Sequence, residues 1–157
     1  MGQQQLLLVI LVTILVGIAT VVALNVFGTA AEDANRDAVR QDLLQGATSA
    51  QAIWARPAML DGAGQDFSRA EISANLIERL GMPIVEDHTA CTGNAGSFGN
   101  ENGCYYIGAE ITNDSFEIIG EPSSGGLDII ADISRNAEGD WVISIADEGE
   151  TVTEDPA

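Results

Sequence analysis

The sequence predicts an α+β fold in which one long N-terminal helix packs on a four-stranded antiparallel β-sheet. Three observations predict this fold. An apolar run occupies the N-terminus, a pattern with a helical period continues it as far as Trp54, and a pattern with a period of two begins at Cys104. At 157 residues, the chain allows one modest domain in addition to such a helix.

The first segment, residues 1–31, is expected to insert into a membrane. No charged residue lies between Gln3 and Ala31, and the run Leu6–Phe27 is almost wholly aliphatic. A helix of about 20 such residues crosses a bilayer core of about 30 Å. Because a helix that is apolar on every side needs lipid or other apolar helices around it, copies of this segment are also expected to pack together.

The helical pattern continues through residues 32–56 and becomes amphipathic there. No proline interrupts it before Pro57, so one helix from about Gln5 to about Trp54 is expected, with a length of about 75 Å at 1.5 Å per residue. Its apolar face contains Ala34, Ala38, Val39, Leu43, Ala47, Ala50 and Trp54. Its polar face contains Asp33, Asn35, Arg36, Asp37, Gln41, Asp42, Gln45 and Gln51.

Residues 57–103 are expected to connect the helix to the sheet. They begin with a break rich in Gly and Pro, after which Ser68 and Glu71 form the pattern of a capping box. An apolar stripe follows this pattern, so a short helix is predicted over residues 69–80. The segment Thr89–Gly103 is rich in Gly and Asn and is predicted to be a loop.

The two cysteines, Cys91 and Cys104, are predicted to form a disulfide that closes this loop. Both lie after the membrane segment, in the part of the chain expected to reach an oxidising compartment. Two free thiols are the alternative. A metal pair is disfavoured, because His88 is the only histidine and the sequence contains no second pair of cysteines.

From residue 104 to residue 147, apolar and polar residues alternate as in half-buried strands. The expected strands cover Tyr105–Thr112, Phe116–Ile119, Leu127–Ile133 and Trp141–Ile145. A sheet with one apolar face needs a cover, and the amphipathic half of the long helix is the available one. Trp54 and Trp141 are expected in the core between helix and sheet, and the acidic tail 148–157 is expected to be solvated.

The charge balance disfavours nucleic acids and anionic membrane surfaces as partners. The chain has 24 acidic residues against six basic ones, which gives a formal net charge of −18, and all the basic residues are arginine. Nucleic acids and anionic membrane surfaces are polyanions and would repel such a chain. An acidic surface of this density fits a high-salt organism, in which the screening length falls to about 3 Å at 1 M salt.

No enzymatic activity, cofactor or metal site is predicted. His88 has no evident nucleophile as a partner, and the carboxylates are scattered in the pattern of a solvated face. Acidic and amide groups occur in Asn100–Asn102 and in the tail, but they lack the spacing of a calcium-binding loop.

The order of apolar helix, amphipathic continuation, disulfide loop and antiparallel sheet resembles a type IV pilin or a type II secretion pseudopilin. Gly2, followed by Gln3, Gln4, Gln5 and an aliphatic run, resembles the site at which a prepilin peptidase cuts such proteins. The resemblance implies a subunit that is held in the inner membrane and is then polymerised by pilus assembly machinery into a cell-surface filament. The filament core is then expected to contain Leu6, Leu7, Leu8, Ile10, Leu11, Ile14, Leu15, Gly17, Ile18, Val21 and Leu24.

Two positions depart from the family's pattern. The fifth mature residue is usually glutamate, whereas here it is Leu7 when counted from Gln3, or Gln5 when counted from Met1. No basic residue precedes Arg36, so the usual signal for membrane orientation is missing. Other interpretations stay open: a minor pilin or pseudopilin of a secretion or DNA-uptake apparatus, a lone membrane-anchored binding domain, and a secretory signal cleaved near Thr29–Ala31.

Overall fold

The structure is a computed structural model that describes residues 2–86, 91 and 98–149. The chain forms two compact units, Met1–Ala34 and Asn35–Ala157, which are called the helical unit and the sheet unit below. The first helix, α1 (Gly2–Ala55), contributes residues to both units.

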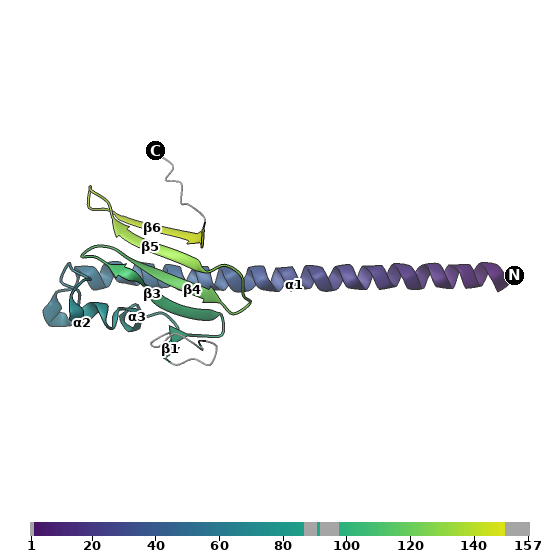
Figure 1. The fold of residues 1–157 in the computed structure, drawn as a ribbon, viewed down its shortest axis with the longest axis horizontal. Coiled ribbons are helices and arrows are strands. Elements are labelled where there is room, and N and C mark those ends of the chain that lie inside the picture. The colour runs from purple at the N-terminus through teal and green to yellow at the C-terminus, as the bar shows by residue number, and fades with distance from the viewer. Residues whose placement is uncertain (1, 87–90, 92–97, 150–157) are drawn as a thin grey trace. The chain divides into compact units, whose positions relative to one another are not determined.

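Short helices and an antiparallel sheet follow α1 in the sheet unit (Figure 1). The helical elements are η1 (Ala58–Leu60), α2 (Ala70–Ser73) and α3 (Leu76–Arg79). The strands are β1 (Val85–Glu86), β2 (Phe98–Gly99), β3 (Gly103–Ile111), β4 (Phe116–Pro122), β5 (Ile129–Arg135) and β6 (Trp141–Asp147). The α+β class predicted from the sequence is therefore confirmed.

The long helix α1 is uninterrupted over 54 residues. Its sequence contains no proline, and aliphatic and other helix-compatible residues fill both halves. The helix ends at Ala55, just before Pro57, because proline disfavours a helical conformation for the residue that precedes it. The prediction of one long N-terminal helix is therefore confirmed.

The core of the sheet unit lies between the second half of α1 and one face of the sheet, as Figure 1 shows. Val39, Leu43 and Ala47 of α1 are fully buried, at the helical spacing expected for one face. Strand residues that alternate with exposed ones pack against them. The largest fully buried side chains of the sheet are Tyr105, Phe116, Ile118, Ile129 and Ile133.

The sheet has six strands in the order β1-β2-β3-β4-β5-β6, all antiparallel, so the prediction of four strands was wrong. The two additional strands, β1 and β2, contain two residues each. Such short segments show no alternation from which a strand can be recognised. Leu127 was expected on the apolar face of β5, but it lies before that strand and is 56% exposed.

The connecting region contains two four-residue helices, α2 and α3, in place of the single helix predicted over 69–80. The predicted capping box does not form, because the N-cap of α2 is Arg69 and makes no side-chain cap hydrogen bond. Ser68 instead donates from its backbone N and its Oγ to Asp66 Oδ1, at 2.8 and 2.6 Å. Local turn bonds of this kind compete with helix capping for the same side chain.

One glycine is required by the close packing of α1 on the sheet. A Cβ at Gly120 of β4 would lie 2.8 Å from Val39 Cγ1 and 3.3 Å from Leu43 Cδ1. We therefore expect Gly120→Val to lower the free energy of unfolding by about 1–3 kcal/mol through overpacking. Denaturant unfolding of the full chain in detergent checks this, with Glu121→Val on the exposed face of the same strand as the control. Equal stability of the two variants would contradict the packing described here.

Candidate assembly and anchoring surfaces

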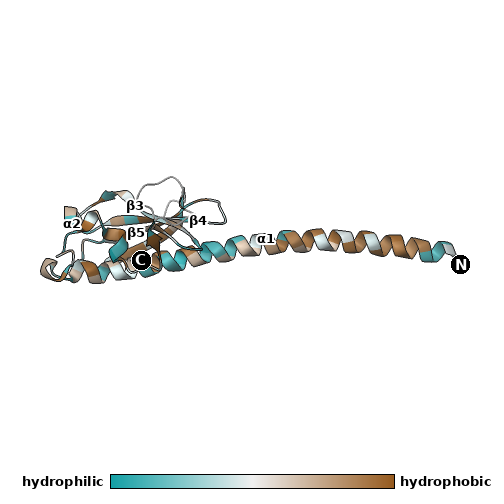
Figure 2. Cartoon of the chain, turned by 90° about the horizontal axis from the view of Figure 1, so that it is seen from below, coloured by the Kyte–Doolittle hydropathy of each residue, from teal (hydrophilic) through white to brown (hydrophobic). Residues whose placement is uncertain are grey.

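The helical unit consists of an apolar helix whose side chains are exposed. The large filament-core residues predicted from the sequence are between 47% and 67% exposed. Figure 2 shows the hydrophobic colouring along this half of α1. The helix is long and apolar enough to cross a membrane, with a mean hydropathy of 3.1 in its most apolar window and none of that window buried. These properties are those of a membrane-inserting segment or a signal.

The residues of the predicted processing site, Gly2 and Gln3, form the beginning of α1 and are exposed. A Cβ at Gly2 would meet no atom within 4 Å, and the same is true of Gly17. A small residue at Gly17 therefore leaves room for a second helix to approach the backbone closely.

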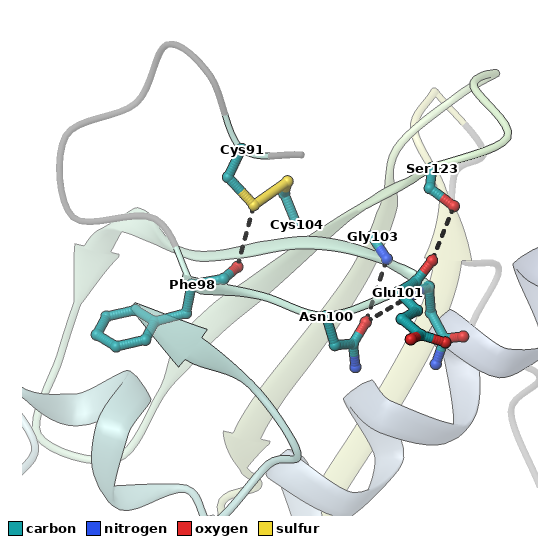
Figure 3. Close-up of a disulfide and its surroundings, with 8 residues drawn as sticks. Cys91, Phe98, Asn100, Glu101, Gly103, Cys104 and Ser123 are labelled. Atoms are coloured by element: carbon teal, nitrogen blue, oxygen red, sulfur yellow. Dashed lines mark hydrogen bonds between the residues drawn. A yellow bond between two sulfur atoms is a disulfide. The ribbon is translucent and has the colours of Figure 1, made fainter. Parts of the chain in front are cut away.

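The predicted disulfide is present between Cys91 and Cys104, with a Cα–Cα distance of 5.5 Å (Figure 3). Cys104 lies in β3 opposite Gly99 of β2, so the bond ties Cys91 to the beginning of β3. Cys91 Sγ lies 3.6 Å from the Phe98 carbonyl oxygen, which is a packing contact because a disulfide sulfur has no proton to donate.

We expect Cys104→Ser to lower the stability of the sheet unit. A bridge across a separation of 13 residues restricts the unfolded chain, and its removal costs about 3 kcal/mol in the chain-entropy description. Unfolding of the full chain under oxidising conditions measures the effect, and wild type treated with a reductant provides a matched comparison. An unchanged midpoint for both samples would mean that the bond contributes nothing to the fold.

A buried carboxylate joins α1 to the segment between β2 and β3. Asp42 is 9% exposed, and its Oδ2 accepts hydrogen bonds from Tyr105 Oη at 2.7 Å, Asn100 Nδ2 at 2.8 Å and Asn102 Nδ2 at 2.9 Å. Hydrogen bonds to a charged group are stronger than those between neutral groups. Three such bonds offset the free-energy cost of removing the Asp42 carboxylate from water. Asp42 was predicted on the polar face of the helix, and that prediction was wrong.

The hydroxyl of Tyr105 acts as a permanent donor to this carboxylate. Burial raises the pKa of Tyr105 well above its usual range, and the hydrogen bond to Asp42 and the negative charge of Asp42 raise it further. Asn100 also uses its Oδ1 to accept from the backbone N of Gly103 at 3.2 Å (Figure 3). Hydrogen bonds from Asn100 and Asn102 to Asp42 therefore hold the disulfide-closed segment to α1, in addition to apolar packing.

Two arginines of α1 bind the end of the last strand. Arg36 Nη2 lies 2.8 Å from Asp147 Oδ1, and Arg40 Nη2 lies 3.0 Å from the same oxygen. Arg36 also donates to the Leu127 carbonyl at 2.9 Å. The polar face predicted from the sequence contained Arg36. No local pattern reveals the partner that the two arginines share, because Asp147 lies 107 residues from Arg40.

The two tryptophans lie together at the other end of the helix–sheet interface. Trp54 and Trp141 form an edge-to-face pair with ring centroids 5.6 Å apart, and both pack against the core. The guanidinium of Arg135 lies 4.3 Å from the centroid of the Trp54 ring. This placement agrees with the expectation that the tryptophans belong to the core.

Several groups considered in the sequence analysis lie outside the described residues. They are His88, the middle of the loop Thr89–Gly103, and the tail from residue 150. Within the part of the chain that the structure describes, no group of three His, Cys, Asp or Glu residues is arranged to hold a metal ion.

The structure defines the chain as one with an apolar N-terminal helix suited to membrane insertion, whose second half packs on an antiparallel sheet. This arrangement is compatible with a pilin-like fold. Comparisons of the chain with protein families, with curated proteins and with solved structures found no match.

Proposed function

We propose that this chain is the structural subunit of an extracellular, type IV pilus-like filament that polymerises through the first half of α1. In this proposal the helical unit inserts into the inner membrane before assembly, and the filament serves adhesion or motility. A prepilin peptidase that acts between Gly2 and Gln3 and a pilus assembly machinery are the implied partners.

The observation that carries this proposal is the exposed apolar surface of the helical unit. Burial of one Leu or Ile side chain contributes about 1.5–3 kcal/mol, and ten large aliphatic side chains of the predicted filament core are exposed here. Outside a membrane, only copies of the same helix can cover such a surface in the required quantity. The ordering cost of association reduces the gain but leaves a large drive for assembly.

The sheet unit supports the proposal in a different way. It holds its own core, a disulfide and the Asp42 hydrogen bonds, all within residues 35–149. A domain of this kind keeps its fold while the apolar helix exchanges lipid neighbours for helix neighbours. Both an abundant pilin and a minor pilin or pseudopilin need this property.

A lone membrane-anchored binding domain is the alternative of a different class, and it needs no contact between helices. The test is to delete the gene in the source cells and restore it with the wild-type chain. The proposal expects surface filaments to disappear and return, with this chain as their main component. Unchanged filaments in the deletion strain, with the chain found as a monomer in the membrane, would favour the anchor.

A further inference from the structure

The turn that follows α1 is held rigidly and projects apolar side chains. Backbone N–H groups of Ala63 and Gln65 donate to carbonyls in the last turn of α1, and that of Gly64 donates to the carbonyl of Arg56 just after it, each at 2.9 Å. Asp61, in the left-handed conformation at φ 62°, forms an ion pair with Arg79 at 2.7 Å. These bonds fix the loop without burying its outermost residues.

Met59 and Leu60 are 95% and 66% exposed on this turn, beside the exposed side chain of Arg56. Arg56 is also the one arginine that forms no side-chain ion pair, hydrogen bond or ring contact with the described residues. The other five arginines all form such contacts, namely Arg36, Arg40, Arg69, Arg79 and Arg135. The turn therefore presents two apolar side chains and one cation that this chain leaves uncovered, and we call it the apolar tip.

The face of the sheet turned away from α1 carries a complementary row. Strand register places Tyr106 opposite Ile119, Ile119 opposite Ile130, and Ile130 opposite Ala146. Their neighbours along the strands point into the core, so these four side chains point outward, and all four are half-exposed. Together they form an apolar row across β3, β4, β5 and β6.

Carboxylates flank this apolar row on both sides. Glu117 lies directly opposite Asp132 on one side, and Glu121 and Asp128 lie on the other. Like charges directly opposite each other in a sheet repel, and no arginine of the described residues is bonded to any of these four carboxylates. A cation placed between Glu117 and Asp132 would relieve their repulsion.

We propose that the apolar tip of one copy docks on the apolar row of a second copy. Met59 and Leu60 cover Tyr106, Ile119 and Ile130, and the Arg56 guanidinium binds the carboxylates of Glu117 and Asp132. Tip and row are different surfaces, so the contact is heterologous and repeats from copy to copy, as an open helical polymer requires. This inference rests on the proposed filament, to which it adds a contact independent of the apolar helices.

Cross-linking of the full chain tests the contact. Filaments made of the double variant Leu60→Cys with Ile119→Cys are treated with a short bismaleimide, which leaves the native disulfide intact. We expect a ladder of covalent multimers. The matched control is Leu60→Cys with Glu138→Cys, which places the second thiol in the turn between β5 and β6, and we expect no ladder from it. Normal filaments without a ladder from the first pair would overturn the contact while leaving the filament proposal in place.

A charge exchange gives a second readout. Arg56→Glu in the Leu60→Cys, Ile119→Cys background should lower the yield of multimers about fivefold, which corresponds to about 1 kcal/mol for an exposed ion pair. Adding Glu117→Arg should restore the yield, and failure to restore it would contradict the proposed pairing. If cells form no filaments of this chain, the same cross-linking is run on the chain in detergent micelles. A concentration-dependent ladder there supports the contact, and its absence overturns it.

Discussion

Val16→Asp is expected to abolish filaments while the chain still reaches the membrane and folds. A carboxylate at the centre of an apolar helix costs about 2.5–3.5 kcal/mol on insertion scales, which the many aliphatic residues around Val16 outweigh. In a bundle of packed helices the same charge repeats in every subunit with no cation nearby, since the helical unit contains no Lys or Arg. The charge is therefore expected to prevent filament assembly while still permitting membrane insertion.

Electron microscopy of cell surfaces measures this effect, and two controls make it specific. Formation of the Cys91–Cys104 disulfide, read on a non-reducing gel, reports that the sheet unit was exported and folded. Val16→Thr keeps the shape of the side chain without its charge and should retain filaments. Abundant filaments in the Asp variant would contradict the proposal that these helices form the filament core.

The second large effect is expected from Asp42→Ala. Removal of the carboxylate leaves the Tyr105 hydroxyl and the Asn102 amide without this acceptor, while the Asn100 amide keeps its hydrogen bond to the Pro83 carbonyl at 3.2 Å. The buried Tyr105 hydroxyl and the part-buried Asn102 amide then lack a partner at about 1–3 kcal/mol each, so we expect the free energy of unfolding to fall by about 2–4 kcal/mol. The fluorescence of Trp54 and Trp141, both packed against the core of the sheet unit, reports unfolding of the full chain in detergent.

Asp37→Ala is the matched control for this experiment. Asp37 lies one and a half turns earlier on α1, its side chain is 68% exposed, and it pairs with Arg40 at 3.3 Å. Exposed ion pairs contribute about 0–1 kcal/mol, so this variant should remain near wild type. Similar losses for the two variants would mean that the Asp42 hydrogen bonds do not hold the segment before β3 to the helix.

The elements with strong periodicity were predictable from the sequence. The aliphatic run and the spacing of Val39, Leu43 and Ala47 were sufficient for α1, and the alternation after Cys104 was sufficient for four strands. The disulfide followed from the presence of two cysteines in a segment expected outside the membrane. Each of these inferences depends on a local pattern or on a count.

The features missed from the sequence depend on partners that are distant in the chain. Asp42 lies three residues after Val39 and four before Gly46, on the buried stripe of α1, yet its charge placed it on the solvated face. Its three donors are about 60 residues away in sequence, and so no helical pattern reveals them. The spacing from Val39 to Gly46 was the one local sign that Asp42 is buried.

The two short strands were missed for a related reason. The two-residue strand β2 pairs with β3, where Cys104 forms the disulfide, and β1 in turn pairs with β2. Strand propensity over two residues carries too little information to predict a strand. The failed capping box at Ser68 shows the same limit, because the nearby carboxylate of Asp66 competed for the hydroxyl.

The most direct test of the filament proposal is to shear appendages from the source cells and read the intact mass and N-terminus of their main protein. The proposal predicts thin helical filaments made of this chain, beginning at a processed residue after Gly2. The same measurement would contradict it if the sheared material lacked this chain and the chain remained in the membrane as an unprocessed monomer.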